Sequence, residues 1–112
     1  MLVVEDDCDV ATGVAALLEL EGMSVQIAEN GAKAIAVAGS WSPQLAVIDV
    51  CLPDMYGDAA YRRMSGDLPV IFSSGEASDE RLRDLIARPN VLLLVKPYEF
   101  NELYAAIRKL LA

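Results

Sequence analysis

Short apolar runs alternate with longer segments of helical periodicity along the whole chain, and this alternation limits the possible folds more than any other feature. Strands are predicted at residues 2–4, 24–28, 45–48, 69–72 and 91–95. Helices are predicted between and after them, near residues 10–20, 30–38, 58–64, 78–88 and 100–111. Strands joined through helices pair in parallel by right-handed crossovers. The sequence therefore predicts a doubly wound α/β domain with one parallel sheet between two helical layers.

Two of the predicted helices carry signals for their ends and for their packing. The first has large apolar residues at i, i+4, i+7 and i+8, which are Val10, Val14, Leu17 and Leu18. Gly22 is expected to cap its carboxyl end, and Asp7 and Asp9 favour its positive start. The fourth is expected to run as one helix from a cap at Ser78 to the residue before Pro89.

Length and charge exclude several kinds of protein. The chain has 112 residues, enough for one ordinary domain, and we expect residues 1–112 to form it. Hydrophobic residues make up 54% and charged residues 23%, which is the composition of a folded chain. The formal net charge of -8 offers no basic surface for nucleic acid or for an anionic membrane. Direct contact with DNA is therefore not expected.

The cysteine and histidine content limits the cellular compartment and the kinds of catalytic or metal site that we expect. Cys8 and Cys51 show neither C-x-x-C spacing nor a paired framework, so we expect a reducing, cytoplasmic compartment. No apolar run reaches the roughly 20 residues needed to cross a bilayer, and no basic leader precedes the first strand. Histidine is absent, which removes the usual general base, a common zinc ligand and any Ser-His or Cys-His pair.

Polar side chains follow four of the five predicted strands. They are Glu5 and Asp6 after the first, Asp49 after the third, Ser74 after the fourth and Lys96 after the fifth. Taken singly, an acidic run is more often a helix cap, a serine a turn residue and a lysine a surface charge. In open parallel sheets, however, ligands bind outside the carboxyl ends of the strands. The joint occurrence therefore points to a single site.

Clustered carboxylates predict a cation at this site. Close carboxylates repel one another unless a cation or a proton lies between them. Oxygen ligands without histidine or thiolate favour Mg²⁺, or a similar hard ion such as Mn²⁺. Such an ion accepts phosphoryl oxygens, and an aspartate can act as a phosphoryl acceptor when positive charge offsets the charge of the transferred group. Lys96 would supply that charge, and the Ser74 hydroxyl could donate to one phosphoryl oxygen.

Four segments in register resemble the receiver domain of two-component response regulators. They are residues 2–7, 48–57, 69–75 and 95–98, and the spacing between them also agrees with that family. The resemblance covers nearly the whole chain, from residue 2 to residue 111. It implies a flavodoxin-like (βα)5 domain with strand order 2-1-3-4-5. It also implies a phosphorelay function. The only reactions expected are the gain and loss of a phosphoryl group on the chain itself, so we expect no enzymatic activity on another substrate.

The resemblance implies a role for each residue of the acidic site. Asp49 would accept a phosphoryl group from a phosphohistidine on a histidine kinase or a histidine phosphotransfer protein. Glu5, Asp6 and Asp49 would form the metal pocket, with Asp6 as the more direct ligand and Glu5 acting through water. The backbone carbonyl of Cys51 would complete the coordination. Mg²⁺ or Mn²⁺ is the implied cofactor.

The resemblance also implies a switch. Ser74 would contact the phosphoryl group and Lys96 would pair with it, and the Lys96-Pro97 peptide bond is expected to be cis. Phosphorylation would repack the surface formed by the fourth helix, the fifth strand and the fifth helix, for a downstream protein or an output domain to read. Leu93 departs from the family pattern, because many receivers carry Tyr or Phe at this switch position.

Two other functions remain open from the sequence. A receiver-like module could bind partners without phosphorylation, and Leu93 leaves this possibility open. A phosphohydrolase with an aspartate nucleophile would resemble a D-x-D pattern, but Cys51 stands where the second aspartate would be. Tyr56 could contact a partner or be a surface aromatic, and Trp41 is expected to be a packing residue.

Overall fold

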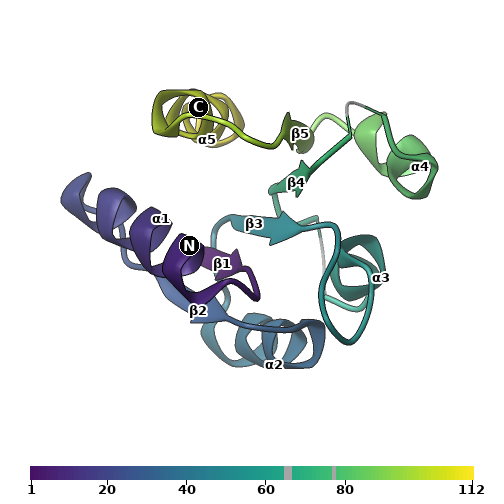
Figure 1. Ribbon diagram of the computed structural model, residues 1–112, viewed down its shortest axis with the longest axis horizontal. Helices are drawn as coiled ribbons and strands as arrows, with labels where there is room; N and C mark the ends of the chain where they lie inside the picture. The colour runs from purple at the N-terminus through teal and green to yellow at the C-terminus, as the bar shows by residue number, and fades with distance from the viewer. Residues whose placement is uncertain (65–66, 77) are drawn as a thin grey trace.

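The computed structural model describes residues 1–64, 67–76 and 78–112 as alternating strands and helices (Figure 1). The elements are β1 (Leu2–Val4), α1 (Cys8–Leu20), β2 (Gln26–Ala28), α2 (Gly31–Trp41), β3 (Ala46–Asp49), α3 (Gly57–Arg62), β4 (Val70–Ser74), the 3-10 helix η1 (Glu80–Leu82), α4 (Arg83–Ile86), β5 (Val91–Val95) and α5 (Phe100–Leu111). Five strands thus alternate with helices, as the apolar pattern predicts.

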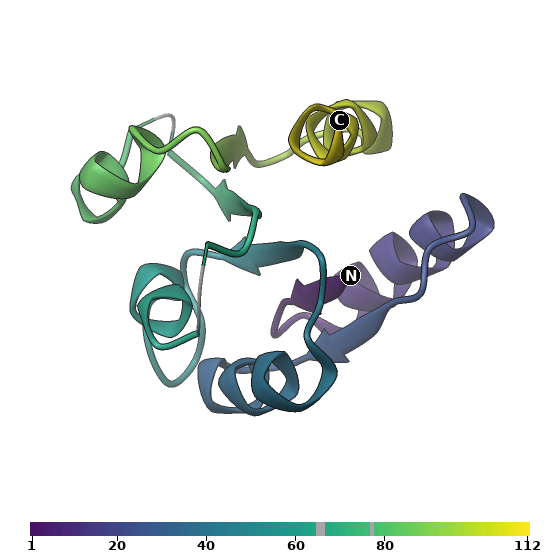
Figure 2. The same ribbon diagram turned by 180° about the vertical axis from the view of Figure 1, so that it is seen from behind.

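All strands belong to one parallel sheet in the order β2-β1-β3-β4-β5. Figures 1 and 2 show α1 and α5 on one face of this sheet and α2, α3 and α4 on the other. The doubly wound fold and its strand order are therefore confirmed. Because the strand order reverses at β1 and β3, the carboxyl ends of these two strands are where a ligand site is expected.

The core consists of one apolar layer on each face of the sheet. Val3, Val47 and Ile71 point toward α1 and α5, where they meet Leu18 and Leu103. The alternate residues of the same strands point toward α2, α3 and α4, and they include Val4, Ile48 and Phe72. Every residue of β3 and β4 is buried, because helices cover both faces of these central strands.

The strands β3 and β4 extend further than the sequence predicts. Asp49 pairs with Ser73, and Ser74 pairs with Val95, so the sheet continues to the polar residues themselves. The predicted boundaries at residues 48 and 72 follow the end of the apolar runs, whereas the hydrogen-bonded ladder does not depend on apolar side chains. As a result, Asp49 and Ser74 are held by the sheet rather than by loops.

The packing face of α1 differs from our prediction. Val10 and Leu17 are 44% and 42% exposed, and the buried residues are Ala11, Ala15 and Leu18. Small residues let the helix axis approach the sheet closely, so the larger side chains lie at the edge of the contact. The end of the helix is as predicted: Gly22 has φ +86°, and its amide donates to the Glu19 carbonyl at 3.0 Å.

The segment after β4 is not the single helix that we predicted. Asp79, and not Ser78, is the cap, and its carboxylate accepts from the Arg81 amide at 3.0 Å. A 3-10 turn, η1, follows, and α4 has only 4 residues. Leu82 and Leu85 are the buried residues of these two elements. Short helices depend on tertiary packing for their stability, and two buried apolar residues stabilise only a short helical segment.

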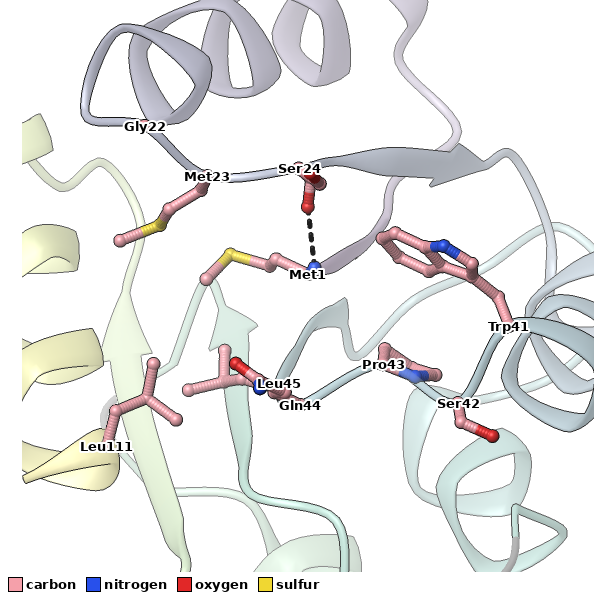
Figure 3. Close-up of a pocket in the computed structure, with 10 residues that line it drawn as sticks. All are labelled: Met1, Gly22, Met23, Ser24, Trp41, Ser42, Pro43, Gln44, Leu45 and Leu111. Carbon is pink, nitrogen blue, oxygen red and sulfur yellow. Dashed lines mark hydrogen bonds between the residues drawn. The ribbon is translucent and has the colours of Figure 1, made fainter.

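The amino ends of β1, β2 and β3 line an open hollow of about 420 Å³ (Figure 3). Its lining includes Met1, Met23, Trp41, Leu45 and Leu111. The amino group of Met1 donates to the Ser24 carbonyl at 2.7 Å, which ties β1 to the segment before β2. Helix α2 runs to Trp41, beyond its predicted end at residue 38, and brings this ring to the rim of the hollow.

Candidate functional site

At the opposite end of the sheet, an ammonium group lies between two carboxylates. Lys96, after β5, places its Nζ 3.0 Å from Asp49 Oδ2 and 3.2 Å from Glu5 Oε1. The side chains of Glu5 and Asp49 are only 9% and 11% exposed, while that of Lys96 is 35% exposed. Residues that lie 91 and 47 positions from Lys96 in the sequence are thus joined by the parallel strands.

The pKa values of Glu5 and Lys96 reflect the electrostatic cost of burying these charged groups together. Burial raises the pKa of Glu5, and the hydrogen bond and the negative charge of Asp49 raise it further, against the opposing effect of Lys96. Burial alone would lower the pKa of Lys96, but its contacts with Asp49 and Glu5 outweigh burial and leave that pKa raised. Lys96 therefore remains protonated at neutral pH, and the carboxylates still repel each other.

Three carboxylates are arranged to hold a cation. Glu5, Asp6 and Asp49 each offer an oxygen, and these oxygens lie within 4.8 Å of one another. The first and the last of these residues are buried, while Asp6 is exposed. An oxygen-only donor set that must relieve mutual repulsion fits a hard divalent ion such as Mg²⁺ or Mn²⁺. The cluster could therefore hold a metal of the predicted kind.

The backbone after Asp49 folds back onto its side chain. The Cys51 amide donates to Asp49 Oδ1 at 3.2 Å, which orients the carboxylate, and the thiol of Cys51 is exposed. An isolated antiparallel bridge pairs Cys51 with Tyr56 and closes the loop between β3 and α3. The Cys51 backbone is therefore next to the carboxylate, in the region where its carbonyl is predicted to act.

Gly57 is a residue of the site that our sequence reasoning did not identify as necessary. Its amide donates to the Val50 carbonyl at 2.7 Å. A Cβ at this position would lie 2.4 Å from the backbone oxygen of Asp49, which is too close for any side chain. Helix α3 can therefore start against the end of β3 only with glycine here. The glycine after the loop was visible in the sequence, but the contact was not.

Asp54 is another residue whose contacts could not be predicted from the sequence. Its two carboxylate oxygens accept from the Gly31 and Ala32 amides at 2.8 and 3.0 Å, at the start of α2. These two hydrogen bonds lower the pKa of Asp54. Asp54 thereby fastens the loop after Asp49 to a neighbouring helix. The partner lies 23 residues away in the sequence, so no local signal identifies it.

Ser74 lies at the end of β4, buried beside the group of charged residues. Its carbonyl accepts from the Lys96 amide at 2.7 Å, and its Oγ accepts from the Glu76 amide at 3.1 Å. Within the described part of the chain, this hydroxyl makes no hydrogen bond to Asp49 or Glu5. The structure therefore brings Glu5, Asp49 and Lys96 into direct contact and leaves the hydroxyl one strand away.

Two further predicted positions lie in or after β5. The Lys96-Pro97 peptide bond is cis. Leu93 is half-buried and packs against the core on the face covered by α2, α3 and α4. Tyr56, for which the sequence left two interpretations open, is 47% exposed, and the Arg81 guanidinium lies 3.8 Å from the centre of its ring.

Comparison with known proteins identifies the family. The family model of the response regulator receiver domain matches residues 1–108. The chain belongs to this family. The receiver domain is 36% identical to the transcriptional regulatory protein PrrA of Mycobacterium leprae, over 99% of the chain and 49% of PrrA. It is 33% identical to the response regulator MprA of Mycobacterium tuberculosis, over 99% of the chain and 50% of MprA.

The receiver domain spans about half the length of these curated relatives. Among solved structures, it is similar to the receiver domain of the hybrid histidine kinase CckA, with a TM-score of 0.83 and 27% identity. That match covers 99% of this chain and 97% of the other. In the described residues, none of the helices has the length and apolar character needed to cross a bilayer.

Proposed function

We propose that Asp49 accepts a phosphoryl group from a phosphohistidine on a histidine kinase or a histidine phosphotransfer protein. The observation that carries this proposal is the position of Lys96, whose ammonium group is in contact with the carboxylates of both Asp49 and Glu5. A nucleophilic carboxylate beside a fixed cation is what phosphoryl transfer requires, since most of its catalysis comes from positioning and charge.

The transfer step needs no reagent beyond the phosphohistidine. An oxygen of the Asp49 carboxylate forms a bond to phosphorus as the bond from phosphorus to the imidazole nitrogen breaks, and the electron pair leaves with that nitrogen. Lys96 offsets the negative charge on the phosphoryl oxygens. The Cys51 amide holds Asp49 Oδ1, which keeps the carboxylate in one orientation during the approach of the partner.

A divalent cation would be held by Glu5, Asp6 and Asp49, together with the backbone carbonyl of Cys51. When bound, it supplies positive charge that offsets both the carboxylates and the incoming phosphoryl group. The raised pKa of Glu5 supports this assignment, because it reports an electrostatic cost that a cation removes. Residues 1–112 would make up the receiver unit, acting in the cytoplasm.

The output would come from Ser74. Its Oγ accepts a hydrogen bond from the Glu76 amide and can donate its own hydrogen to a phosphoryl oxygen. Turning toward Asp49 would draw the segment after β4 with it and alter the surface of α4, β5 and α5. A downstream protein or an output domain would read this surface, as expected for a domain that spans half of its transcription-regulator relatives.

The test is phosphorylation by a small phosphodonor. The protein is incubated with acetyl phosphate and Mg²⁺, and intact mass spectrometry measures the adduct. We expect one acid-stable, base-labile phosphoryl group, which is absent from Asp49→Asn and from a sample treated with EDTA. An adduct that persists in Asp49→Asn would contradict the assignment of the acceptor. A folded wild-type protein that forms no adduct, but still binds its partner, would instead be a phosphorylation-independent module.

A further inference from the structure

A stacking contact attaches the segment of η1 and α4 to the loop after β3. The guanidinium carbon of Arg81 lies 3.8 Å from the centre of the Tyr56 ring, within the range of a cation–π contact. Asp79 Oδ1 holds the same arginine through its Nη1 at 3.3 Å and through its amide at 3.0 Å. The Asp79 side chain is only 8% exposed, so Arg81 is fixed from two sides.

The tyrosine side of this contact leads directly to the acceptor. Tyr56 pairs with Cys51, whose amide holds the Asp49 carboxylate. The residue after Tyr56 is Gly57, which packs against the Asp49 backbone without room for a Cβ. The position of the Tyr56 ring is therefore coupled through two short backbone links to the orientation of Asp49.

The arginine side leads to the predicted switch hydroxyl. Ser74 Oγ holds the Glu76 amide, and the chain then continues into η1, where Arg81 lies. Because the Ser74 hydroxyl holds the Glu76 amide, a turn of Ser74 toward Asp49 displaces Glu76 with it. The stack between Tyr56 and Arg81 thus joins the two loops that leave neighbouring strands, β3 and β4, at the site.

We propose that the Tyr56–Arg81 stack is a latch that holds η1 and α4 against the acceptor loop until Asp49 is phosphorylated. This inference rests on the proposed function, and it assigns the coupling between the site and α4 to an aromatic residue of the loop. Leu93 in β5 lacks a ring that could do so. Displacement of Glu76 together with Ser74 withdraws Arg81 from the ring, while Arg62 and Asp84, paired at 2.8 Å, still hold α4 to α3.

The matched variants are Arg81→Gln and Arg83→Gln. Both remove one positive charge from the same segment, but Arg83 is 80% exposed and pairs only with Glu80 among the described residues. Opening the latch should favour the form that accepts the phosphoryl group. We therefore expect Arg81→Gln to be phosphorylated by acetyl phosphate about two- to fivefold faster, the effect of one exposed cation–π contact, and Arg83→Gln to be unchanged.

A double-mutant cycle separates the stack from other effects of these residues. Tyr56→Leu should reproduce the rate of Arg81→Gln, and the double variant should be no faster than either single variant. Equal rates in Arg81→Gln and Arg83→Gln would overturn the latch. Rate changes that add in the double variant would also overturn it, because residues that act through one contact cannot both contribute fully.

Nuclear magnetic resonance can follow the contact between Tyr56 and Arg81 in the wild-type chain. The ring current of Tyr56 should displace the Nε–Hε signal of Arg81, and Mg²⁺ with beryllofluoride, a phosphoryl mimic, should return it toward the value of a free arginine. An unchanged Arg81 signal, in a sample where the amides of Asp49 and Lys96 do shift, would overturn the latch alone. If those amides do not shift either, the proposed function fails and the latch fails with it.

Discussion

The two ends of the sheet bury different kinds of side chains. At the amino end, the apolar side chains of Met1, Trp41 and Leu45 lie beside a hollow, and Leu45 is fully buried. At the carboxyl end of the same strands, Glu5 and Asp49 are buried next to each other, with Lys96 between them. Apolar burial stabilises the fold, whereas buried like charges cost stability unless they are neutralised. Burial at the amino end therefore contributes to the stability of the fold, whereas the carboxyl end carries an electrostatic cost that a bound cation would remove.

The largest expected effect on stability lies at the amino end. Leu45 is fully buried, and Leu45→Ala should lower the free energy of unfolding by about 2–5 kcal/mol because it leaves a cavity. Urea unfolding measures this loss. The rate of phosphorylation by acetyl phosphate, measured where the variant is still folded, should be unchanged. A large fall in that rate would show that the two ends are not independent.

At the carboxyl end, removal of the Lys96 charge should lower the rate of phosphorylation. Lys96→Met keeps the length of the side chain and loses the charge, so we expect phosphorylation by acetyl phosphate to slow by about 100-fold. Lys33→Met is the matched control, because Lys33 pairs with Glu29 on the exposed surface of α2. Initial rates from intact mass spectrometry measure both. A Lys96→Met rate within threefold of wild type would contradict the role of this lysine.

A substitution at Gly57 tests whether the backbone at the carboxyl end tolerates an added Cβ atom. Gly57→Ala should lower the free energy of unfolding by about 1–3 kcal/mol, since its Cβ would meet the Asp49 oxygen at 2.4 Å. Gly39→Ala in α2 is the control, because nothing lies within 4 Å of its Cβ, and it should raise stability by about 0.5–1 kcal/mol. Equal effects in both variants would mean that the close approach at Gly57 is not tight.

The smallest expected effect is a dependence of stability on pH. The pKa of Glu5 is raised in the folded chain, so the stability that this carboxyl contributes is full below its ordinary pKa and is lost as pH rises through the folded value. In EDTA, Glu5→Gln should therefore gain stability relative to wild type between pH 4 and pH 7, by about 1 kcal/mol or less. Urea unfolding at several pH values measures the difference, and a constant difference would contradict it.

Local patterns in the sequence located the strands and most of the helices, but they did not predict the contacts between them. The apolar runs located β3 and β4, and Gly22 marked the end of α1. The same periodicity indicated the wrong face for Val10 and Leu17, because it cannot tell which apolar residues meet the sheet. The helix expected after Ser78 became η1 and α4 for a similar reason, since packing decides how much of a short helix forms.

The sequence by itself determined the alternating order of strands and helices, and with it the convergence of Glu5, Asp49 and Lys96. Periodicity is a local property, and parallel strands must all end at the same edge of their sheet. Only the tertiary structure decided that Asp54 accepts from the first two amides of α2 and that Arg81 covers Tyr56. These contacts join residues that are more than 20 positions apart, and their geometry depends on how separate elements pack rather than on any pattern along the chain.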